Sequence, residues 1–328
     1  MSEIDASVRP HARGTRLKLL LAFMAIYLVW GSTFFAIRVA IAGMPPFLMC
    51  GVRLLLAGVM MLVWAWRSGS AWPRGVEWRN AALVGLMLPA AGNGLVTLAE
   101  SHVPSGLVAL LMGSIPMWMA LMAAVGPERS ALRPRVSFGL VLGVAGIALL
   151  VGPGAIPGAT PSAWGWSALP VLGAMSWAYG SLWSRRVPMP ASPLASTAVG
   201  LTAGGVLLIA IGMGVGEPAR VTAAAFQPAP VAALLYLAVF GSVVGFTAYL
   251  WLLQRVSPTL VSTYAFVNPV VAMLLGFAFA GEPFGARTLV AALLVLIAVA
   301  LIVTAPAPTV RPSAQFQPRG PLPGLTKS

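Results

Sequence analysis

Ten apolar runs, separated by short polar or proline-containing breaks, occupy the chain from residue 19 to residue 304. They lie at about 19–41, 46–66, 81–99, 104–125, 136–152, 164–184, 194–214, 231–252, 258–280 and 286–304. A helix needs about 20 mostly apolar residues to cross a hydrocarbon core of about 30 Å. We therefore predict an all-α integral membrane protein with ten transmembrane helices, and the short breaks favour antiparallel neighbours in a bundle.

The composition leaves little room for a soluble domain. Of the 328 residues, 59% are apolar and 8% are charged, whereas an average soluble domain has roughly 45–50% and 25%. The net charge of +13 raises the alternative of a nucleic-acid partner. The basic residues lie in short connectors between apolar runs, so we expect the lipid bilayer as a partner and no nucleic acid. Cys50 is the only cysteine, which excludes an intrachain disulfide and a cysteine-based metal site.

The distribution of basic residues predicts the orientation. With a cytoplasmic N-terminus, the inner segments hold sixteen of the twenty Lys and Arg residues. Arg38, Arg220 and Arg287 fall in or beside outer segments, and Arg53 falls within the second run. Cytoplasmic loops of membrane proteins are enriched in Lys and Arg, so we expect both termini in the cytoplasm.

Similar segments recur in the two halves of the chain. "LAESHVPSGLVALL" at 98–111 aligns with "LLQRVSPTLVSTYA" at 252–265, and Trp30 in the first run has a counterpart in Trp177 in the sixth. Each half then holds five spans, and an odd number places the halves in opposite orientations. We predict a cytoplasmic N-terminal segment at 1–18, two inverted five-helix repeats at 19–152 and 164–304, and a proline-rich, disordered cytoplasmic tail at 305–328.

Four segments carry a resemblance to a known family. They are "LVWGSTFFAIRVAIAGMPP", "AESHVPSGLVALL", "GAMSWAYGSLWSRR" and "SPTLVSTYAFVNPVVAMLLGFAFAGEPF", in this order along the chain. Together they resemble the paired EamA-type repeats of the drug/metabolite transporter superfamily, in particular its YedA-like exporters. The resemblance covers residues 19 to about 304. It implies ten helices around a central cavity, alternating access, and export of amino acids or other small metabolites.

Several polar and aromatic residues fall near the middle of the predicted spans. Uncharged hydrogen-bonding and aromatic side chains suit a cavity for a small organic molecule, and the alternative for each is packing between helices. Trp30 also lies deeper than the membrane interface where Trp is usually found. The predicted substrate-binding set is Trp30, Ser32, Asn93, Thr97, Trp177, Tyr179, Tyr264 and Asn268.

Two ionisable residues are predicted to act in coupling or gating. Glu100 ends an apolar run and is the only acid close to the membrane interior, where ionisable groups are usually functional; we expect it to exchange protons if export is coupled to them. Its alternative role is a carboxylate at headgroup level. Arg53 lies about seven residues into the second run, where it either binds an anionic group or extends its long side chain outward.

The remaining motifs narrow the function classes. The chain has no G-x-x-x-x-G-K-[ST] phosphate loop and no H-E-x-x-H motif, so we expect no ATP hydrolysis, no metal site and no cofactor. The leading hypothesis is a secondary-active or facilitative exporter in the inner membrane of a bacterium. One alternative is a membrane-embedded enzyme acting on a lipid-linked substrate, for which only Glu100 and His102 offer catalytic groups. Another is a receptor or scaffold, which an inverted repeat gives no reason to expect.

Overall fold

A computed structural model describes residues 9–125, 133–151, 162–253, 255–256, 261, 264–282 and 285–305. Within these ranges the ordered elements are helices, and no strand occurs. The sequence predictions for residues 1–8 of the N-terminal segment, for the tail from residue 306 onward, and for the repeat partner Pro258 lie outside the described residues.

Each predicted apolar run is mainly helical where the structure describes it, and the run at 104–125 is interrupted by a turn at Gly113 and Ser114. Several rods contain more than one helical segment. In chain order the helices are α1 Arg9–Met24, η1 Ala25–Val29, α2 Trp30–Ile41, α3 Pro46–Arg67, α4 Val76–Gly85, η2 Leu86–Asn93, α5 Gly94–Glu100, α6 Ser105–Met112, α7 Ile115–Val125, α8 Pro134–Val151, α9 Ser162–Ser184, α10 Pro193–Gly214, η3 Glu217–Arg220, η4 Ala223–Phe226, α11 Pro228–Tyr236, η5 Leu237–Val244, α12 Gly245–Leu253, α14 Tyr264–Ala280 and α15 Ala286–Val303.

Seven of the described helical rods are long and apolar enough to span a membrane. They are Arg16–Ile41, Pro46–Arg67, Val76–Glu100, Ser105–Val125, Pro193–Gly214, Pro228–Tyr249 and Ala286–Val303. Two further apolar helices, Pro134–Leu149 and Val267–Ala280, are shorter. The fold is thus a multi-pass helical bundle, and the count of ten spans remains a prediction.

Proline marks where several helices begin. Pro46, Pro193 and Pro228 each occupy the first turn of a helix, where the missing N–H has no intrahelical partner to lose. Ser192 precedes α10, and its hydroxyl accepts a 3.2 Å hydrogen bond from the backbone N–H of Ala195. These start signals agree with the breaks between apolar runs in the sequence.

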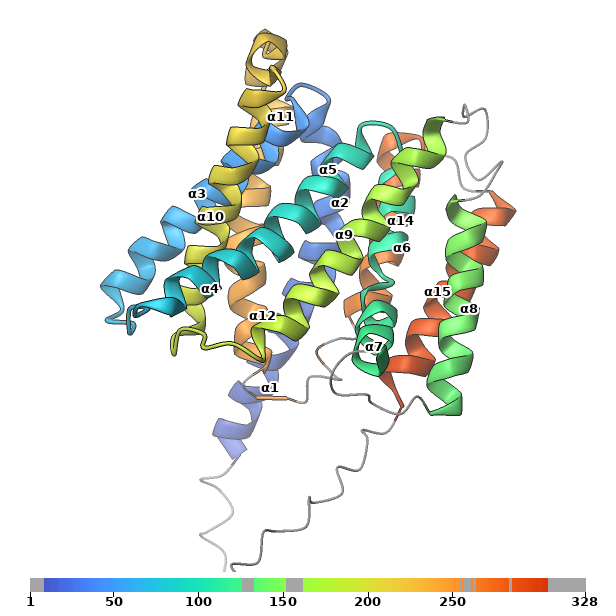
Figure 1. The fold of residues 1–328 in the computed structure, drawn as a ribbon, viewed down its shortest axis with the longest axis horizontal. Coiled ribbons are helices and arrows are strands. Elements are labelled where there is room, and N and C mark those ends of the chain that lie inside the picture. Colours follow the sequence, from blue (N-terminus) through green and yellow to red (C-terminus); the bar gives the residue numbers. More distant parts are fainter. Residues whose placement is uncertain are drawn as a thin grey trace, which may run out of the picture.

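Two tightly packed helix pairs lie at opposite sides of the bundle (Figure 1). On one side α3 packs against α10, where a side chain added at Gly205 would meet the backbone nitrogen of Leu55 at 2.5 Å. On the other side α8 packs against α15, and an added side chain at Gly139 would lie 3.1 Å from the Ala298 carbonyl. Small residues let helix backbones approach closely where lipid provides no hydrophobic driving force.

Helices in the two halves match in length and position. The pair α3 and α10 each have 22 residues, and α8 and α15 each have 18. The matching extends to an uncommon feature, because η2 and η5 are both eight-residue π-helical segments. Each continues directly into an α-helix that begins with glycine, α5 at Gly94 and α12 at Gly245.

The π-helical segments matter because they leave backbone carbonyls available. A π segment changes the hydrogen-bond register inside a helix and often marks a functional site. Besides η2 and η5, a third segment, η1, interrupts the first rod between α1 and α2. Pro89 lies inside η2, where its missing N–H and its ring prevent a regular helical bond.

Candidate functional site

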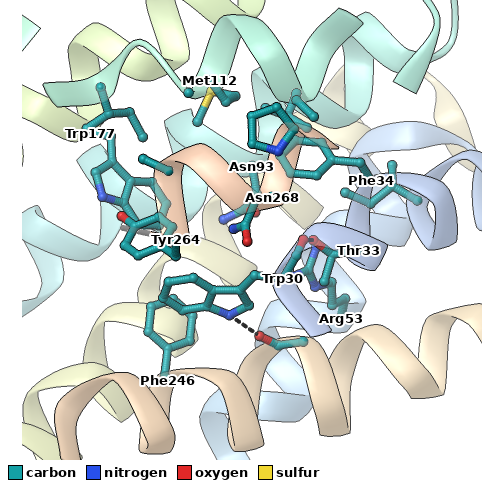
Figure 2. A pocket seen from close by; sticks show the side chains of 18 residues that line it. Trp30, Thr33, Phe34, Arg53, Asn93, Met112, Trp177, Phe246, Tyr264 and Asn268 are labelled. Carbon is teal, nitrogen blue, oxygen red and sulfur yellow. Dashed lines mark hydrogen bonds between the residues drawn. The ribbon is translucent and has the colours of Figure 1, made fainter. Parts of the chain in front are cut away.

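A cavity lies between the two tightly packed pairs, in the centre of the bundle. Its volume is about 100 Å³. Figure 2 shows side chains from both halves of the chain around it. The residues that line it are Trp30, Thr33, Phe34, Ile37, Arg53, Asn93, Val96, Ala109, Met112, Gly113, Ile115, Trp177, Gly241, Phe246, Tyr264, Ala265, Asn268 and Pro269.

Aromatic side chains form one wall of the cavity. The ring of Trp30 lies 5.1 Å from that of Tyr264 and 5.6 Å from that of Phe246, both nearly edge-on, and 5.4 Å from that of Tyr249. Edge-to-face rings at these distances attract each other beyond their buried area. Trp30 also donates a 3.0 Å hydrogen bond from Nε1 to the carbonyl of Gly241 in η5 (Figure 2). The ring of Trp30 is therefore fixed by aromatic contacts and its N–H by a hydrogen bond.

Two asparagines place amides in the cavity (Figure 2). The Asn93 side chain donates a 3.1 Å hydrogen bond to the carbonyl of Pro89 within η2. In the orientation that satisfies its amide, the Asn268 nitrogen lies 3.2 Å from the carbonyls of Ile26, Tyr27 and Tyr264. Ile26 and Tyr27 belong to η1, so both asparagines bind carbonyls of π-helical segments.

Arg53 lines the cavity from α3 and is almost fully buried, with 4% of its surface exposed. Its Nε donates a 3.4 Å hydrogen bond to the hydroxyl of Ser242, which in turn donates to the carbonyl of Leu237 in η5 at 3.1 Å. Its Nη1 is buried and has no hydrogen-bond partner among the described residues. The side chain therefore stays inside the protein rather than reaching outward to the membrane surface.

Glu100 lies beyond the cavity at the end of α5 and is fully buried. Neither carboxylate oxygen has a hydrogen-bond partner among the described residues. Arg38 donates a hydrogen bond to the backbone carbonyl of Glu100, and the carboxylates of Glu100 and Glu282 interact electrostatically. A buried carboxylate without partners is costly to keep charged, which is the kind of group that a transport cycle can use.

Glu282 and Glu217, which were not among the predicted site residues, bind the first turns of helices in the other half of the chain. Glu282 accepts from the backbone N–H groups of Ser105 and Gly106 at 2.7 and 3.0 Å, at the start of α6. Glu217 accepts from Phe47 and Leu48 at 3.1 and 2.7 Å, at the start of α3. A carboxylate there satisfies N–H groups that have no intrahelical partner and complements the helix dipole.

Five of the eight predicted substrate-binding residues line the cavity, namely Trp30, Asn93, Trp177, Tyr264 and Asn268, and so does Arg53. Three lie elsewhere. The Ser32 hydroxyl pairs with the Tyr236 hydroxyl at 2.6 Å, Thr97 is fully buried outside the cavity, and Tyr179 is 51% exposed on the outside of α9.

Helix geometry explains which predictions fell outside. Successive residues turn by about 100° around a helix, so residues two apart face nearly opposite directions. Ser32 and Tyr179 each follow a cavity tryptophan by two positions and therefore face away from it. Tyr264 and Asn268 are four apart and share a face. Thr33 and Phe246 also line the cavity but were not predicted, although one is polar and the other aromatic.

The alternative of a membrane-embedded enzyme requires Glu100 and His102 to act as catalytic groups, and the structure describes both. Glu100 is buried, whereas His102 is exposed and stacks on Trp166, with ring centroids 3.8 Å apart and planes 5° apart. The two side chains form no hydrogen bond with each other, because Glu100 has no partner. Among the described residues, no group of three or more His, Cys, Asp or Glu side chains is arranged to hold a metal ion.

Comparison with known proteins gives consistent matches. The model of the EamA-like transporter family matches the chain twice, at residues 17–152 and 164–304. The chain is 37% identical over 287 residues to the uncharacterized inner membrane transporter YedA of Escherichia coli strain K12, covering 87% of this chain and 90% of that protein. It is 28% identical over 269 residues to a probable terminal-alkyne amino-acid exporter of Streptantibioticus cattleyicolor, covering 81% and 86%.

A solved crystal structure shares the fold. Its chain superimposes with a TM-score of 0.59 at 21% sequence identity, and the match covers 87% of this chain and 96% of that one. At this identity the likeness supports the arrangement of helices and says nothing about what the cavity binds.

Proposed function

Because this chain belongs to the EamA-like transporter family, we propose that it exports amino acids or other small organic metabolites across the inner membrane, by secondary-active or facilitated transport. The observation that carries this proposal is the central cavity, in which amide and aromatic groups from both halves meet an otherwise apolar wall. Such a mixture of a few polar groups with apolar surface is typical of sites for small organic molecules.

The proposal includes two inverted five-helix repeats, residues 19–152 and 164–304. The equal lengths of α3 and α10, and of α8 and α15, support this organisation. The equivalent π-helical segments η2 and η5 and the two matches to one family model support it further. In inverted repeats the substrate site lies between the halves, which agrees with a cavity lined by α2 and α14 together.

The proposed mechanism is alternating access. The volume of the cavity, about 100 Å³, is smaller than the roughly 300–1,000 Å³ of sites that hold a drug-sized ligand. Entry of a metabolite therefore requires the walls to separate. The aromatic cluster around Trp30 and the hydrogen bonds of Glu217 and Glu282 join segments of different halves, and these contacts are the ones that a rocking motion would break and remake.

Glu100 is the proposed proton carrier if export is driven by protons. It is fully buried, its carboxylate oxygens have no hydrogen-bond partners among the described residues, and it lies near three other ionisable groups, Glu282, Arg38 and Arg53. Taking up a proton removes the charge of a buried carboxylate and changes its interaction with each of these groups. A change of this kind is able to shift the balance between two conformations.

The proposed orientation, with both termini in the cytoplasm, rests on the asymmetry of Lys and Arg residues along the chain. A reporter fused after Lys327 should report the cytoplasm, and one inserted at residues 154–162 should report the outside. A cytoplasmic signal from the internal fusion would contradict the proposed ten-span topology.

Export itself is tested by mass spectrometry of the growth medium of cells that produce the protein, with cells carrying an empty vector as the reference. The proposal predicts that a defined set of small organic compounds accumulates outside the producing cells. An unchanged medium, with the protein present in the membrane, would contradict export. The enzymatic alternative receives no support from the site, because Glu100 and His102 do not form a pair.

A further inference from the structure

Arg53 is a cation buried in the wall of a cavity within the membrane. It follows the start of α3 at Pro46 by seven residues, about 10 Å along the helix at 1.5 Å per residue. Its exposed fraction is 4%. Burying a charge is costly unless hydrogen bonds and an opposite charge compensate it, so the groups around the guanidinium show what it is built to bind.

The protein holds one edge of the guanidinium and leaves another free. Nε donates to the hydroxyl of Ser242 at 3.4 Å, and that hydroxyl is held by the carbonyl of Leu237. Gly241 lies beside the guanidinium, since a Cβ added there would lie 3.4 Å from Nη2 of Arg53, an ordinary contact distance. Nη1 has no hydrogen-bond partner among the described residues. The planar fork is therefore positioned, and part of its donor capacity is unused.

Glu100 is the internal group that would otherwise compensate Arg53. The two side chains attract each other electrostatically. However, neither carboxylate oxygen of Glu100 accepts a hydrogen bond from a described residue, so the two do not form a direct ion pair. The attraction therefore leaves Nη1 of Arg53 without an acceptor among the described residues.

The other residues that line the cavity indicate which kind of group would accept hydrogen bonds from Arg53. The described residues that line the cavity include no Asp or Glu, whereas Trp30, Trp177 and Phe246 supply aromatic surface. From this combination we infer that the transported molecule carries a carboxylate bound by Arg53 and an apolar body that lies against the aromatic side chains. A guanidinium binds a carboxylate through two parallel hydrogen bonds, which a Lys ammonium does not reproduce. The inference rests on the proposed export function and names its substrate class.

The first test uses the compounds that accumulate outside cells producing the wild-type protein, identified by mass spectrometry. The inference expects each of them to carry a carboxylate. If compounds accumulate and lack a carboxylate, the substrate class is wrong while export stands. If nothing accumulates, export itself fails, and the two failures are therefore distinguishable.

The second test compares an exported acid with its uncharged amide, as initial rates of uptake into inside-out membrane vesicles. A site built to bind one polar group rejects analogues that lack it, so the wild type should move the acid at least about tenfold faster than the amide. In Arg53→Gln this ratio should fall below about threefold, through loss of acid transport. Arg67→Gln is the matched control, because Arg67 is an exposed arginine on the same helix, and should keep the wild-type ratio.

Two results of this second test would also overturn the inference. One is equal rates for acid and amide in the wild type, a comparison that does not depend on whether any variant folds. The other is a tenfold preference for the acid that persists in a folded Arg53→Gln protein. Arg53→Lys keeps the charge but loses the planar fork, and an intermediate ratio in that variant would support recognition through paired hydrogen bonds.

Discussion

The indole nitrogen of Trp30 donates a 3.0 Å hydrogen bond to the carbonyl of Gly241, which joins the first helical rod to a π-helical segment more than 200 residues later in the chain. Replacing Trp30 by Phe keeps an aromatic ring and removes the donor. A net hydrogen bond contributes about 0.5–1.5 kcal/mol, so export should fall roughly two- to tenfold while the protein remains folded. Vesicle transport measures this, with the exposed Trp78→Phe as control; equal losses in both variants would contradict a specific role for Trp30.

Gly245 provides the space in which the Trp30 indole lies, because a side chain there would clash with Nε1. Gly245→Ala should displace the indole, lower the transport rate, and reduce the free energy of unfolding by about 1–3 kcal/mol, as overpacking does elsewhere. Gly214→Ala is the matched control, since an added side chain at Gly214 meets nothing within 4 Å. Thermal unfolding in detergent reports the difference, and similar melting temperatures for the two variants would show that Gly245 is not needed for packing.

Glu282 satisfies two backbone N–H groups at the start of α6. Glu282→Gln removes the charge and turns a donor toward one of these N–H groups, so we expect a loss of about 1–2 kcal/mol in the free energy of unfolding. Glu77→Gln is a suitable comparison, because Glu77, like Glu282, is half-buried but accepts only one backbone N–H, from Arg74. Chemical or thermal unfolding should rank Glu282→Gln clearly below Glu77→Gln, and the reverse order would contradict the bridging role of Glu282.

Glu100→Gln tests coupling to protons. Because the substituted side chain carries no titratable proton, export driven by a pH gradient should be lost, while exchange of substrate across the membrane should persist. The measurement is vesicle transport with and without an imposed pH gradient, for the wild type, Glu100→Gln and Glu77→Gln, in which the acid removed is only half-buried and does not line the cavity. Unchanged stimulation by the gradient in Glu100→Gln would reject the coupling role and leave a facilitated mechanism.

The sequence predicted the helices well and the shape of the site only in part. The helices can be predicted from the sequence because a membrane span requires a long apolar segment, whatever that segment packs against. The aromatic wall of the cavity cannot be predicted in this way, since Trp30, Phe246 and Tyr249 come together only when the two halves of the chain pack. The three π-helical segments were also missed, because no local sequence pattern distinguishes them from an α-helix.

For single residues within correctly predicted helices, the sequence likewise did not show which way the side chain points. Tyr179 was grouped with Trp177 because both lie at mid-depth, yet two residues along a helix reverse the face, and Tyr179 is 51% exposed. Arg53 had two open interpretations, and the structure shows its side chain buried at the cavity wall rather than extended outward. Depth along a helix can be read from a sequence, but the direction of a side chain depends on its neighbours.

The central claim is that this protein moves small organic molecules through the cavity between its halves. The most direct measurement is the uptake of an exported compound into inside-out vesicles containing the wild type, Asn268→Ala or Tyr179→Ala. Asn268 lines the cavity, whereas Tyr179 is exposed outside it. We predict saturable uptake by the wild type and Tyr179→Ala, reduced at least about tenfold in Asn268→Ala through the loss of buried hydrogen bonds. Uptake that is equal in all three vesicle preparations, or equal to that of vesicles without the protein, would contradict the claim.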